Sequence, residues 1–468
     1  MRNPGSIRAR IVIPVVVAII GLVGMRPLFL RSDVRPTDLQ VDVLVVGGSG
    51  AGVAAAMAAA RQGMIVVLVE SRPFLGTVLT GAMLNMIDVS RTPDGAPLIK
   101  GVFHELSQQI DGMTFDPRRV RGILRTMVEA EPGITMYLST ALERPLLEDG
   151  RVIGALLRTE DGYSITVHAP VTIDATDDGD MAAAAGVPFH YGRQTSGIDR
   201  RTMPATLLFR VAGLEWKTIT SYAWAHRRGR QPSGATSGYA WGFREPMRNY
   251  RPQDPLLAAH DLNIGRIPDG SAWINSLQVY NVDGTNPESR REGFERARRE
   301  IPNLVAYLRK NCPGFANARL VETAPELYIR ETRHVRGLYV LTAKDIAART
   351  RFWDRIGAAS YPVDLHQYTK GEQYPYKPVR REYTIPLRSL VTYQVDGLFV
   401  ASRAFSATYQ AAGSARVVPT TMAMGEGVGV AAAVAVIHRV TPHQLTERRD
   451  LVAEVQQRLV RSGALIDF

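Results

Sequence analysis

Cysteine is almost absent from this chain: Cys312 is the only one among 468 residues. A single cysteine excludes an intramolecular disulfide, a cysteine-ligated iron–sulfur cluster and the paired redox cysteines of disulfide reductases. Cys312 lies in the turn-like stretch Lys310–Phe315, so we expect a buried or half-buried structural thiol. The sequence predicts no metal site.

Charge patterns typical of nucleic-acid binding are also missing. The formal net charge is +11, but the basic residues are mostly arginine and are spread along the chain. There is no lysine-rich block and no array of stacked aromatic residues. We therefore expect no nucleic-acid partner, and interpret the charge as a solvated basic surface or an affinity for acidic substrates or lipid head groups.

The first 31 residues differ in kind from the rest. Arginines precede the apolar run Ile11–Met25, and Arg26 ends it. A basic segment followed by an apolar run of this length is typical of a signal sequence, and extension to Leu30 also allows an uncleaved membrane anchor. Residues 1–31 therefore predict a membrane-associated or exported protein; a buried N-terminal strand or helix is the alternative.

The segment Val41–Glu70 has the pattern of one complete βαβ unit with a dinucleotide fingerprint. An apolar run before Gly47 is typical of a buried parallel strand, and an Ala-rich helix and a second apolar strand follow. Gly47 permits the tight turn, Gly52 allows close packing of helix on sheet, and Glu70 ends the second strand where a carboxylate accepts hydrogen bonds from a ribose. The predicted nucleotide-binding residues are Gly47, Gly48, Ser49, Gly50, Ala51, Gly52 and Glu70. Ser49 stands at the middle glycine of the pattern.

Further strands are predicted from apolar runs along the chain. Three runs joined at Asp-Gly turns indicate a β-meander, and another carries Asp177–Asp180 to its carboxyl end. The predicted strands are 134–138, 142–147, 152–157, 163–167, 171–176 and 396–401. A helix is expected from Phe115 to about Ala130, and the turn Gly413–Thr421 leads into a long helix over 422–437.

The domain order follows from these segments. Residues 39–202 and 384–440 form the two parts of a nucleotide-binding domain, because its strand and helix signals return late in the chain. Residues 203–383, richer in Trp, Tyr and Arg, form a substrate domain inserted between them. Residues 441–468 form a C-terminal helical tail.

Several segments together resemble the FAD-dependent oxidoreductase family, whose relatives include the flavin subunit of heterodisulfide reductase and xanthan-lyase-like sequences. The matching stretches, in family order, are Val43–Glu70, Asp174–Asp180, Arg330–Arg333, Tyr339–Thr342, Ser360–Asp364 with His366, and Arg403–Gly429. The resemblance implies FAD and an α/β fold: a Rossmann-like, glutathione-reductase-type FAD-binding domain with a β-meander and an inserted α+β substrate domain. Asp177 departs from the family's usual glycine, and Tyr409 stands where many members have a histidine.

The resemblance also implies further FAD contacts. A helix that begins after the Gly413–Thr421 turn can point its positive end at the flavin N1–C2 carbonyl, where it would stabilise the anionic reduced flavin. The additional cofactor residues predicted in this way are Thr80, Gly81, Asp178, Arg403, Gly413, Arg416 and Thr420.

Proton transfer is assigned to a Tyr/Pro-rich loop. Oxidation of a substrate by flavin needs a base for its hydroxyl or amine proton. His366, two residues after Asp364, is the predicted base and Tyr361 the weaker candidate. A hydrogen-bonded loop histidine without a catalytic role is the alternative.

Arg330 and Arg333 are the candidates for holding the substrate. They are three residues apart, so on a helix they would share a face and could clamp a carboxylate or orient the flavin edge. Arg333 is therefore included among the predicted catalytic residues. Ion pairs with the nearby Glu326 and Glu331 are the alternative explanation.

The predicted function is an FAD-dependent oxidoreductase of dehydrogenase or oxidase type, which transfers hydride from a small polar organic substrate to the flavin. A flavoenzyme reduced by NAD(P)H would need a second fingerprint, and the sequence has only one, so the reductant is the substrate or a protein partner. No motif identifies the electron acceptor. Two alternatives stay open: a non-redox flavin-dependent lyase and a membrane-tethered flavin electron-transfer component.

Overall fold

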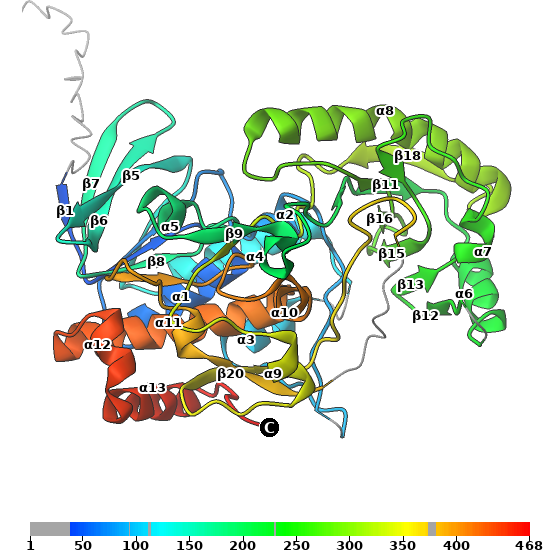
Figure 1. The fold of residues 1–468 in the computed structure, drawn as a ribbon. Helices are drawn as coiled ribbons and strands as arrows, with labels where there is room; N and C mark the ends of the chain where they lie inside the picture. The colour runs from blue at the N-terminus through cyan, green and yellow to red at the C-terminus, as the bar shows by residue number, and fades with distance from the viewer. Residues whose placement is uncertain (1–37, 93, 111–113, 229–230, 373–380) are drawn as a thin grey trace, which may run out of the picture. The chain divides into compact units, whose positions relative to one another are not determined.

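A five-stranded parallel sheet carries the predicted fingerprint (Figure 1). The structure, a computed structural model, describes residues 38–92, 94–110, 114–228, 231–372 and 381–468; the predicted signal or anchor lies outside them. The strand order is β22–β8–β2–β3–β4, with every pairing parallel. The strands are β2 (Val43–Val46), β3 (Val66–Val69), β4 (Ile134–Tyr137), β8 (Val171–Asp174) and β22 (Leu398–Val400). This sheet confirms the parallel strands predicted from the apolar runs.

Two helices rich in glycine and alanine pack together against this sheet. They are α1 (Gly50–Arg61) and α11 (Val418–His438). A Cβ on Gly425 would lie 2.1 Å from the Ala51 carbonyl oxygen, so small residues are required at the contact. In the described part of the chain, α11 alone is long and apolar enough to cross a membrane, but 83% of its most apolar window is buried inside the protein. Core packing therefore explains its composition.

A four-stranded sheet covers the opposite face of the parallel sheet. Its order is β1–β7–β6–β5, and β5, β6 and β7 are antiparallel, which confirms the predicted meander. The strands are β1 (Asp38–Gln40), β5 (Thr140–Glu148), β6 (Arg151–Thr159) and β7 (Ser164–His168). Val152, Leu157 and Val167 pack against Leu44 and Val67 of the parallel sheet.

A second region has its own sheet and its own core; it is the green part of Figure 1. Its six-stranded antiparallel sheet has the order β12–β13–β15–β16–β11–β18. Its strands are β11 (Phe209–Ala212), β12 (Gly234–Ala235), β13 (Tyr239–Gly242), β15 (Leu262–Arg266), β16 (Ala272–Asn275) and β18 (Arg319–Thr323), with β10 (Ala205–Thr206), β14 (Leu257–Ala258) and β17 (Gln278–Val279) in a smaller sheet. The long helix α8 (Pro287–Asn311) ends at Cys312, which is buried as predicted; burial raises the pKa of its thiol to about 12.

The division between the cores differs from the predicted boundary at Tyr383. The apolar side chains of the second core end at Ile329, whereas Leu341, Ile346 and Val363 are buried in the first core. The physical reason is the pair β20 (Arg355–Ala359) and β21 (Tyr383–Pro386): Ile356 of β20 packs on Gly427 of α11.

Two further local predictions need correction. Arg330–Arg333 is not helical, because Arg333 begins β19 (Arg333–Val335), which pairs with β9 (Phe189–Tyr191). Gly413 lies inside a helix, α10 (Tyr409–Ala415), so the turn before α11 is confined to Arg416 and Val417.

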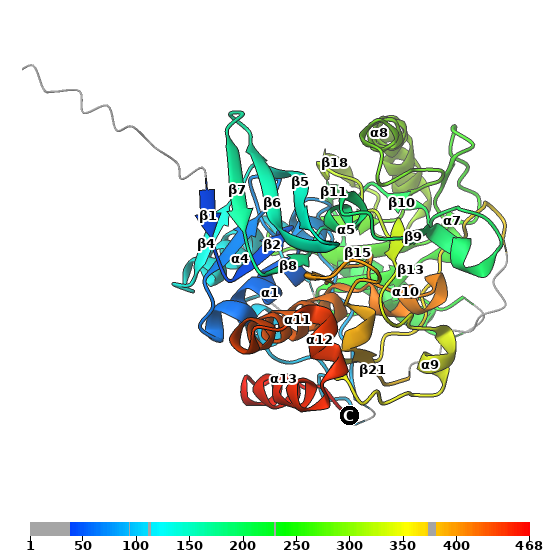
Figure 2. The same cartoon turned by 60° about the vertical axis from the view of Figure 1, so that its left-hand side comes forward.

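The other helices have at most 13 residues. They are α2 (Thr77–Thr80), α3 (Val102–Gln109), α4 (Pro117–Glu129), α5 (Asp180–Ala184), α6 (Trp216–Ala225), α7 (Arg244–Met247), α9 (Ala343–Ala347), α12 (Pro442–Glu447) and α13 (Arg449–Arg461). The helix expected from Phe115 is α4, with Asp116 as its N-cap. Helices α12 and α13 form the predicted helical tail and lie on the outer side of α11 (Figure 2).

Candidate functional site

The turn between β2 and α1 is built for close approach of backbone to a ligand. Gly47 has φ 105°, and a Cβ there would lie 2.4 Å from the Thr176 nitrogen. A Cβ on Gly52 would lie 1.9 Å from the Gly47 carbonyl oxygen. Ser49 caps α1, since its hydroxyl accepts from the Gly52 N–H at 3.3 Å and donates to the Ala175 carbonyl at 2.9 Å. The serine at the middle glycine position therefore ties the turn to the end of β8.

Glu70 is a buried carboxylate at the end of β3. It accepts hydrogen bonds from the Gly48 N–H at 2.7 Å and the Arg72 N–H at 2.9 Å. It also lines a cavity of about 390 Å³, together with Gly47, Thr77 and Asp177. Its contact with a ribose stays a prediction, but its position beside the glycine turn suits that role.

A cleft leads from this cavity to the second region. It shares Thr77 and Asp177 with the cavity at Glu70, and it is lined by Ser49–Ala51, Gly76–Leu79 and Val417–Pro419. The N-termini of α1 and α11 both open on this cleft, and helix N-termini attract negative charge.

Buried polar atoms in the cleft lack partners within the described part of the chain. The Thr77 hydroxyl and the Nε atoms of Arg403 and Arg416 make no hydrogen bond. All three residues line the cleft. Buried polar groups are normally hydrogen-bonded, so these atoms fit a ligand with several acceptors, such as the phosphates and ring carbonyls of a flavin dinucleotide.

The sequence matches the FAD dependent oxidoreductase family over residues 42–459. The chain belongs to this family. FAD is its cofactor and the protein is an enzyme, as the resemblance implied.

Two archaeal relatives match a shorter part of the chain. Digeranylgeranylglycerophospholipid reductase of Sulfolobus acidocaldarius is 29% identical over 161 residues, 30% of this chain and 34% of that protein. The enzyme of the same name from Methanosphaerula palustris is 30% identical over 163 residues, 29% of this chain and 38% of that protein. The match thus covers about a third of each curated relative's length.

Solved structures that match this chain include a reductase-like protein and a brominase. A geranylgeranyl bacteriochlorophyll reductase-like protein of Thermoplasma acidophilum has TM-score 0.45 and 13% identity, covering 91% of this chain and 87% of that one. The flavin-dependent brominase Bmp2 has TM-score 0.42 and 10% identity, covering 85% and 80%.

In the part of the chain that the structure describes, several residues predicted to bind FAD do not line the cleft. The Thr80 hydroxyl donates to the Leu75 carbonyl at 2.5 Å, and the preceding residues Gly76–Leu79 line the cleft instead. Gly81 packs on Glu326, and Gly413 on Asp364. Thr420 is buried, while its neighbour Thr421 lines the cleft.

Asp178 lines the cavity at Glu70 and holds Arg403. Its carboxylate accepts from Arg403 at 2.7 Å and from the Thr332 hydroxyl at 2.6 Å, and it also binds Arg290. Burial alone would raise the pKa of Asp178, but Arg403 and Arg290 hold it below its ordinary value. The negative charge of Asp178 is thus balanced, and Arg403 is the group that faces the cleft.

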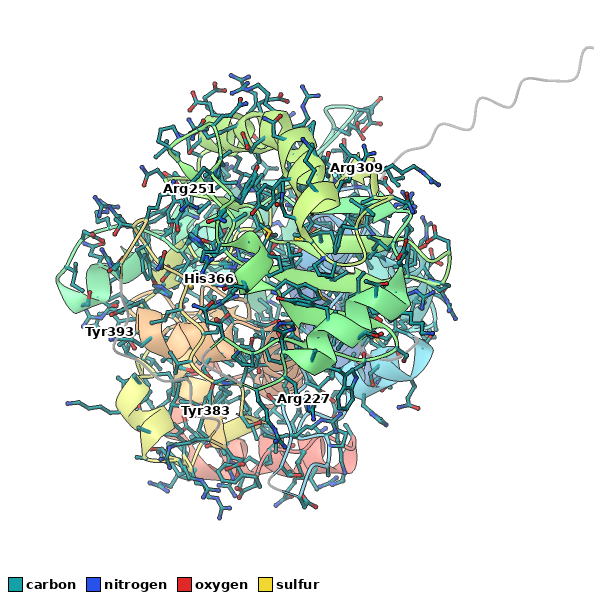
Figure 3. The ribbon with its side chains drawn as sticks, turned by 90° about the vertical axis from the view of Figure 1, so that its right-hand side faces the viewer. Arg227, Arg251, Arg309, His366, Tyr383 and Tyr393 are labelled. Carbon is teal, nitrogen blue, oxygen red and sulfur yellow. The ribbon has the colours of Figure 1, made fainter. Side chains whose placement is uncertain are left out.

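A cavity of about 740 Å³ adjoins the cleft where the two regions meet. Tyr328, Arg330 and Arg416 line both spaces. The cavity lining contains four arginines, three aspartates and two histidines: Arg244, Arg248, Arg330, Arg416, Asp88, Asp261, Asp364, His260 and His366. Figure 3 shows His366 between the green second region and the orange helices of the first.

His366 is held at both ring nitrogens. Nδ1 lies 3.1 Å from the Gln278 amide nitrogen, and Nε2 lies 3.5 Å from Asp364 Oδ2. The Tyr280 hydroxyl donates to the Gln278 amide oxygen at 3.1 Å, which fixes the amide so that it donates to Nδ1. The proton of the neutral ring therefore sits on Nε2, facing Asp364. Burial, and then the charge of Arg330, lower the pKa of His366, so the ring is neutral near pH 7.

Asp364 links His366 to Arg416. Arg416 donates to Asp364 Oδ2 at 3.0 Å and to the Tyr328 hydroxyl at 2.9 Å. Burial opposes ionisation of Asp364, but His366 and Arg416 outweigh it and lower the pKa of the carboxyl. Tyr361, on the same loop, donates to Asp88 at 3.1 Å, and burial raises the pKa of its hydroxyl well above 10.

Arg333 does not line this cavity, which corrects its assignment as a catalytic residue. It pairs with Asp180 at 2.7 Å and lies over the Phe189 ring, because it begins β19 whereas Arg330 lies in the loop before that strand. The proposed glutamate partners are wrong as well: Glu331 binds His334, and Glu326 binds Arg72. Tyr409, which stands where many family members have a histidine, packs edge-on against Tyr368, outside the cavity lining.

Sequence reasoning missed the cavity residues of the second region. Gln278, Asn275, His260 and Arg244 come from separate strands, turns and helices. No local motif marks them, because their proximity arises only from the folding of the second sheet.

Proposed function

We propose that this enzyme is a dehydrogenase or oxidase that oxidises a small polar organic substrate in the 740 Å³ cavity. The observation that carries the proposal is the continuity of the FAD cleft with a cavity lined by charged groups and a neutral histidine. FAD, held by the α1 and α11 N-termini and by Arg403, would supply the two-electron acceptor.

His366 is the proposed proton acceptor. Its Nδ1 lone pair is occupied only by the neutral Gln278 amide, which a substrate hydroxyl or amine can displace. Asp364 then holds Nε2–H and stabilises the charged ring that forms, as a carboxylate does for a catalytic histidine. Arg416 helps to keep Asp364 ionised, and the Tyr328 hydroxyl holds Arg416 in place.

The polarity of the cavity separates this proposal from the activity named for the archaeal relatives. Their names denote reductases of a phospholipid. A long apolar chain in this cavity would strip water from charged groups such as Arg244, Asp261 and Arg330, at a cost in free energy. A small substrate that hydrogen-bonds to these groups avoids that cost.

The finer details of fold and location are proposals too. We propose the glutathione-reductase type of FAD domain, supported by the meander between β4 and β8 and by the α11 N-terminus at the cleft. We propose that the second region is the substrate domain. Location at or beyond a membrane rests on the composition of residues 1–31 alone.

An anaerobic screen tests the proposal. The FAD-loaded protein is mixed with sugars, hydroxy acids and amines, and loss of flavin absorbance is followed. We expect bleaching by at least one of these substrates without NAD(P)H. Bleaching only by NAD(P)H, or only by a partner protein, would reject the proposal, as would product formation with no redox change, which indicates a lyase.

A further inference from the structure

Arg330 is a buried guanidinium whose hydrogen-bond partners are all neutral. Its residue surface is 3% exposed, and Nη1 donates to the Pro204 carbonyl and the Thr206 hydroxyl, both at 2.8 Å. Nη2 lies 3.4 Å from the Asn275 amide oxygen, and the guanidinium stacks on the Tyr328 ring at 4.4 Å. In the part of the chain that the structure describes, it forms no ion pair within 4.0 Å. A charge buried in this way is costly until a counter-charge arrives.

The surrounding charges do not provide that counter-charge. Asp364 already pairs with Arg416 and lies beside His366. Asp261 pairs with Arg244 at 3.1 Å. Asp88 accepts from Tyr361 and forms no ion pair with Arg330. Of the two guanidiniums that line both the cleft and the cavity, Arg416 is paired with Asp364, and Arg330 has no carboxylate of the described residues within ion-pair distance. Burial lowers the pKa of Arg330, and the nearby Arg416 lowers it further.

The exposed arginines of the cavity are already paired. Arg244 and Arg248 also line it, with side chains that are 53% and 68% exposed, and each has a carboxylate partner: Asp261 at 3.1 Å and Glu245 at 3.3 Å. Within the described residues, Arg330 is therefore the arginine of the cavity lining without a carboxylate partner, and it favours a negatively charged ligand.

We infer that the substrate carries a carboxylate, which binds Arg330 in the cavity and leaves the oxidisable carbon toward His366 and the FAD cleft. The inference rests on the proposed function, whose substrate class it narrows from small polar molecules to organic acids. Arg330 suits this task because a planar guanidinium binds a carboxylate through two parallel hydrogen bonds.

The flavin itself is the other source of negative charge, and the structure favours the substrate. Arg416 lies in the two-residue turn before α11, whose N-terminus opens on the FAD cleft. Arg330 is instead held from the second region by Thr206 of β10 and Asn275 of β16. Asn275 lines the large cavity but not the cleft.

Matched pairs of small molecules test the inference on the full-length, FAD-loaded protein. Each pair differs in the carboxylate: glycolate and ethylene glycol, glucuronate and glucose, benzoate and benzyl alcohol. Binding is measured by perturbation of the flavin spectrum, without turnover. We expect at least one acid to bind about tenfold or more tightly than its neutral partner, since an ion pair to a buried charge is worth at least 1.4 kcal/mol.

Three variants show whether Arg330 causes the preference for the acid. Arg330→Met should remove the preference for the acid, and Arg330→Lys should retain part of it. Arg309→Met, on the exposed end of α8, is the matched control and should bind like the parent. Flavin absorbance and circular dichroism show that each variant is folded and loaded; if Arg330→Met does not fold, Arg330→Lys carries the comparison.

The outcomes separate this inference from the proposed function. Equal binding of acids and neutral partners by the parent protein would overturn it, and so would a preference that survives both Arg330 substitutions. An altered flavin spectrum in Arg330→Met with an unchanged preference for acids would assign the charge to the flavin, which also overturns it. An acid that binds through Arg330 but never bleaches the flavin supports this inference while counting against the proposed oxidation.

Discussion

The two regions contribute to the site by different physical means. The parallel-sheet region offers backbone to the FAD cleft: the glycine turn at Gly47, the N–H groups that begin α1, and the N-terminus of α11, with the side chains of Arg403 and Arg416 beside them. The second region offers side chains, such as Gln278 and Arg330, brought together from separate segments. A backbone site depends on a short stretch of sequence, whereas a side-chain site depends on the arrangement of the whole sheet. Substitutions in the two regions should therefore fail in different ways.

Loss of the backbone site should have the largest effect. A Val side chain at Gly52 would place a Cβ 1.9 Å from the Gly47 carbonyl oxygen, which no rotamer relieves. We expect Gly52→Val to abolish FAD binding, measured as flavin absorbance per mole of folded protein. Gly122→Ala, on the exposed face of α4 with nothing within 4 Å of its Cβ, is the control and should stay yellow. Full FAD occupancy in Gly52→Val would refute the fingerprint assignment.

Damage to the side-chain site should leave FAD in place. We expect His366→Asn to bind FAD normally but to slow flavin reduction by roughly 10²-fold or more, the usual loss when a general base is removed. Stopped-flow reduction at saturating substrate measures this step. A rate within a few-fold of the parent would remove His366 from the mechanism and leave Tyr361 as the remaining candidate in the cavity.

The pH profile sharpens the same test. The base must be neutral, and burial lowers the pKa of His366 below its ordinary 6.5. Reduction by the parent should therefore decline on acidification as the ring gains a proton, with a midpoint below pH 6.5. The decline should be absent in His366→Asn; if it persists there, another group titrates.

A smaller effect, on stability rather than on activity, is expected from substitution of a buried side chain in the first region that lies outside the site. Glu426 on α11 is 4% exposed and accepts from the Val102 N–H at 3.2 Å. Burial raises its pKa to about 7, so the folded state favours the neutral form and the free energy of unfolding falls as pH rises from about 4.5 to 7.

Glu426→Gln keeps the acceptor without the charge. It should raise the free energy of unfolding at pH 8 by up to about 3 kcal/mol, with the gain shrinking toward pH 4.5. Urea unfolding at several pH values measures this. Glu129→Gln, exposed on α4, should show no such pH-dependent gain. An unchanged or lower stability of Glu426→Gln at pH 8 would mean that the carboxylate is ionised and paired.

The smallest effect is expected from removal of residues 1–32. Among the described residues, the first apolar side chains that belong to a core are Leu39 and Val43. The two regions therefore have their own apolar contacts without this segment. The shortened chain should fold and keep full FAD occupancy, as shown by flavin absorbance. Loss of folding would favour the alternative of a buried N-terminal element.

The sequence was informative where local pattern and physics coincide. Runs of apolar residues determined the parallel strands, Asp-Gly turns determined the meander, and the spacing from Gly47 to Gly52 determined the nucleotide turn. These features arise from interactions within about thirty residues, the length of one βαβ unit, so they can be inferred without knowing the rest of the fold.

Tertiary structure alone decided the surroundings of the charged side chains. The spacing of Arg330 and Arg333 suggested a shared helix face, but Arg330 lies in a loop, Arg333 begins β19, and sheet contacts set their partners. The hydroxyl of Thr80 turns to its own loop, whereas that of Thr77 faces the cleft. Such choices depend on which distant groups lie within a few ångströms. The identity of the cofactor was therefore local information, while the chemistry of the cavity beside it required the folded chain.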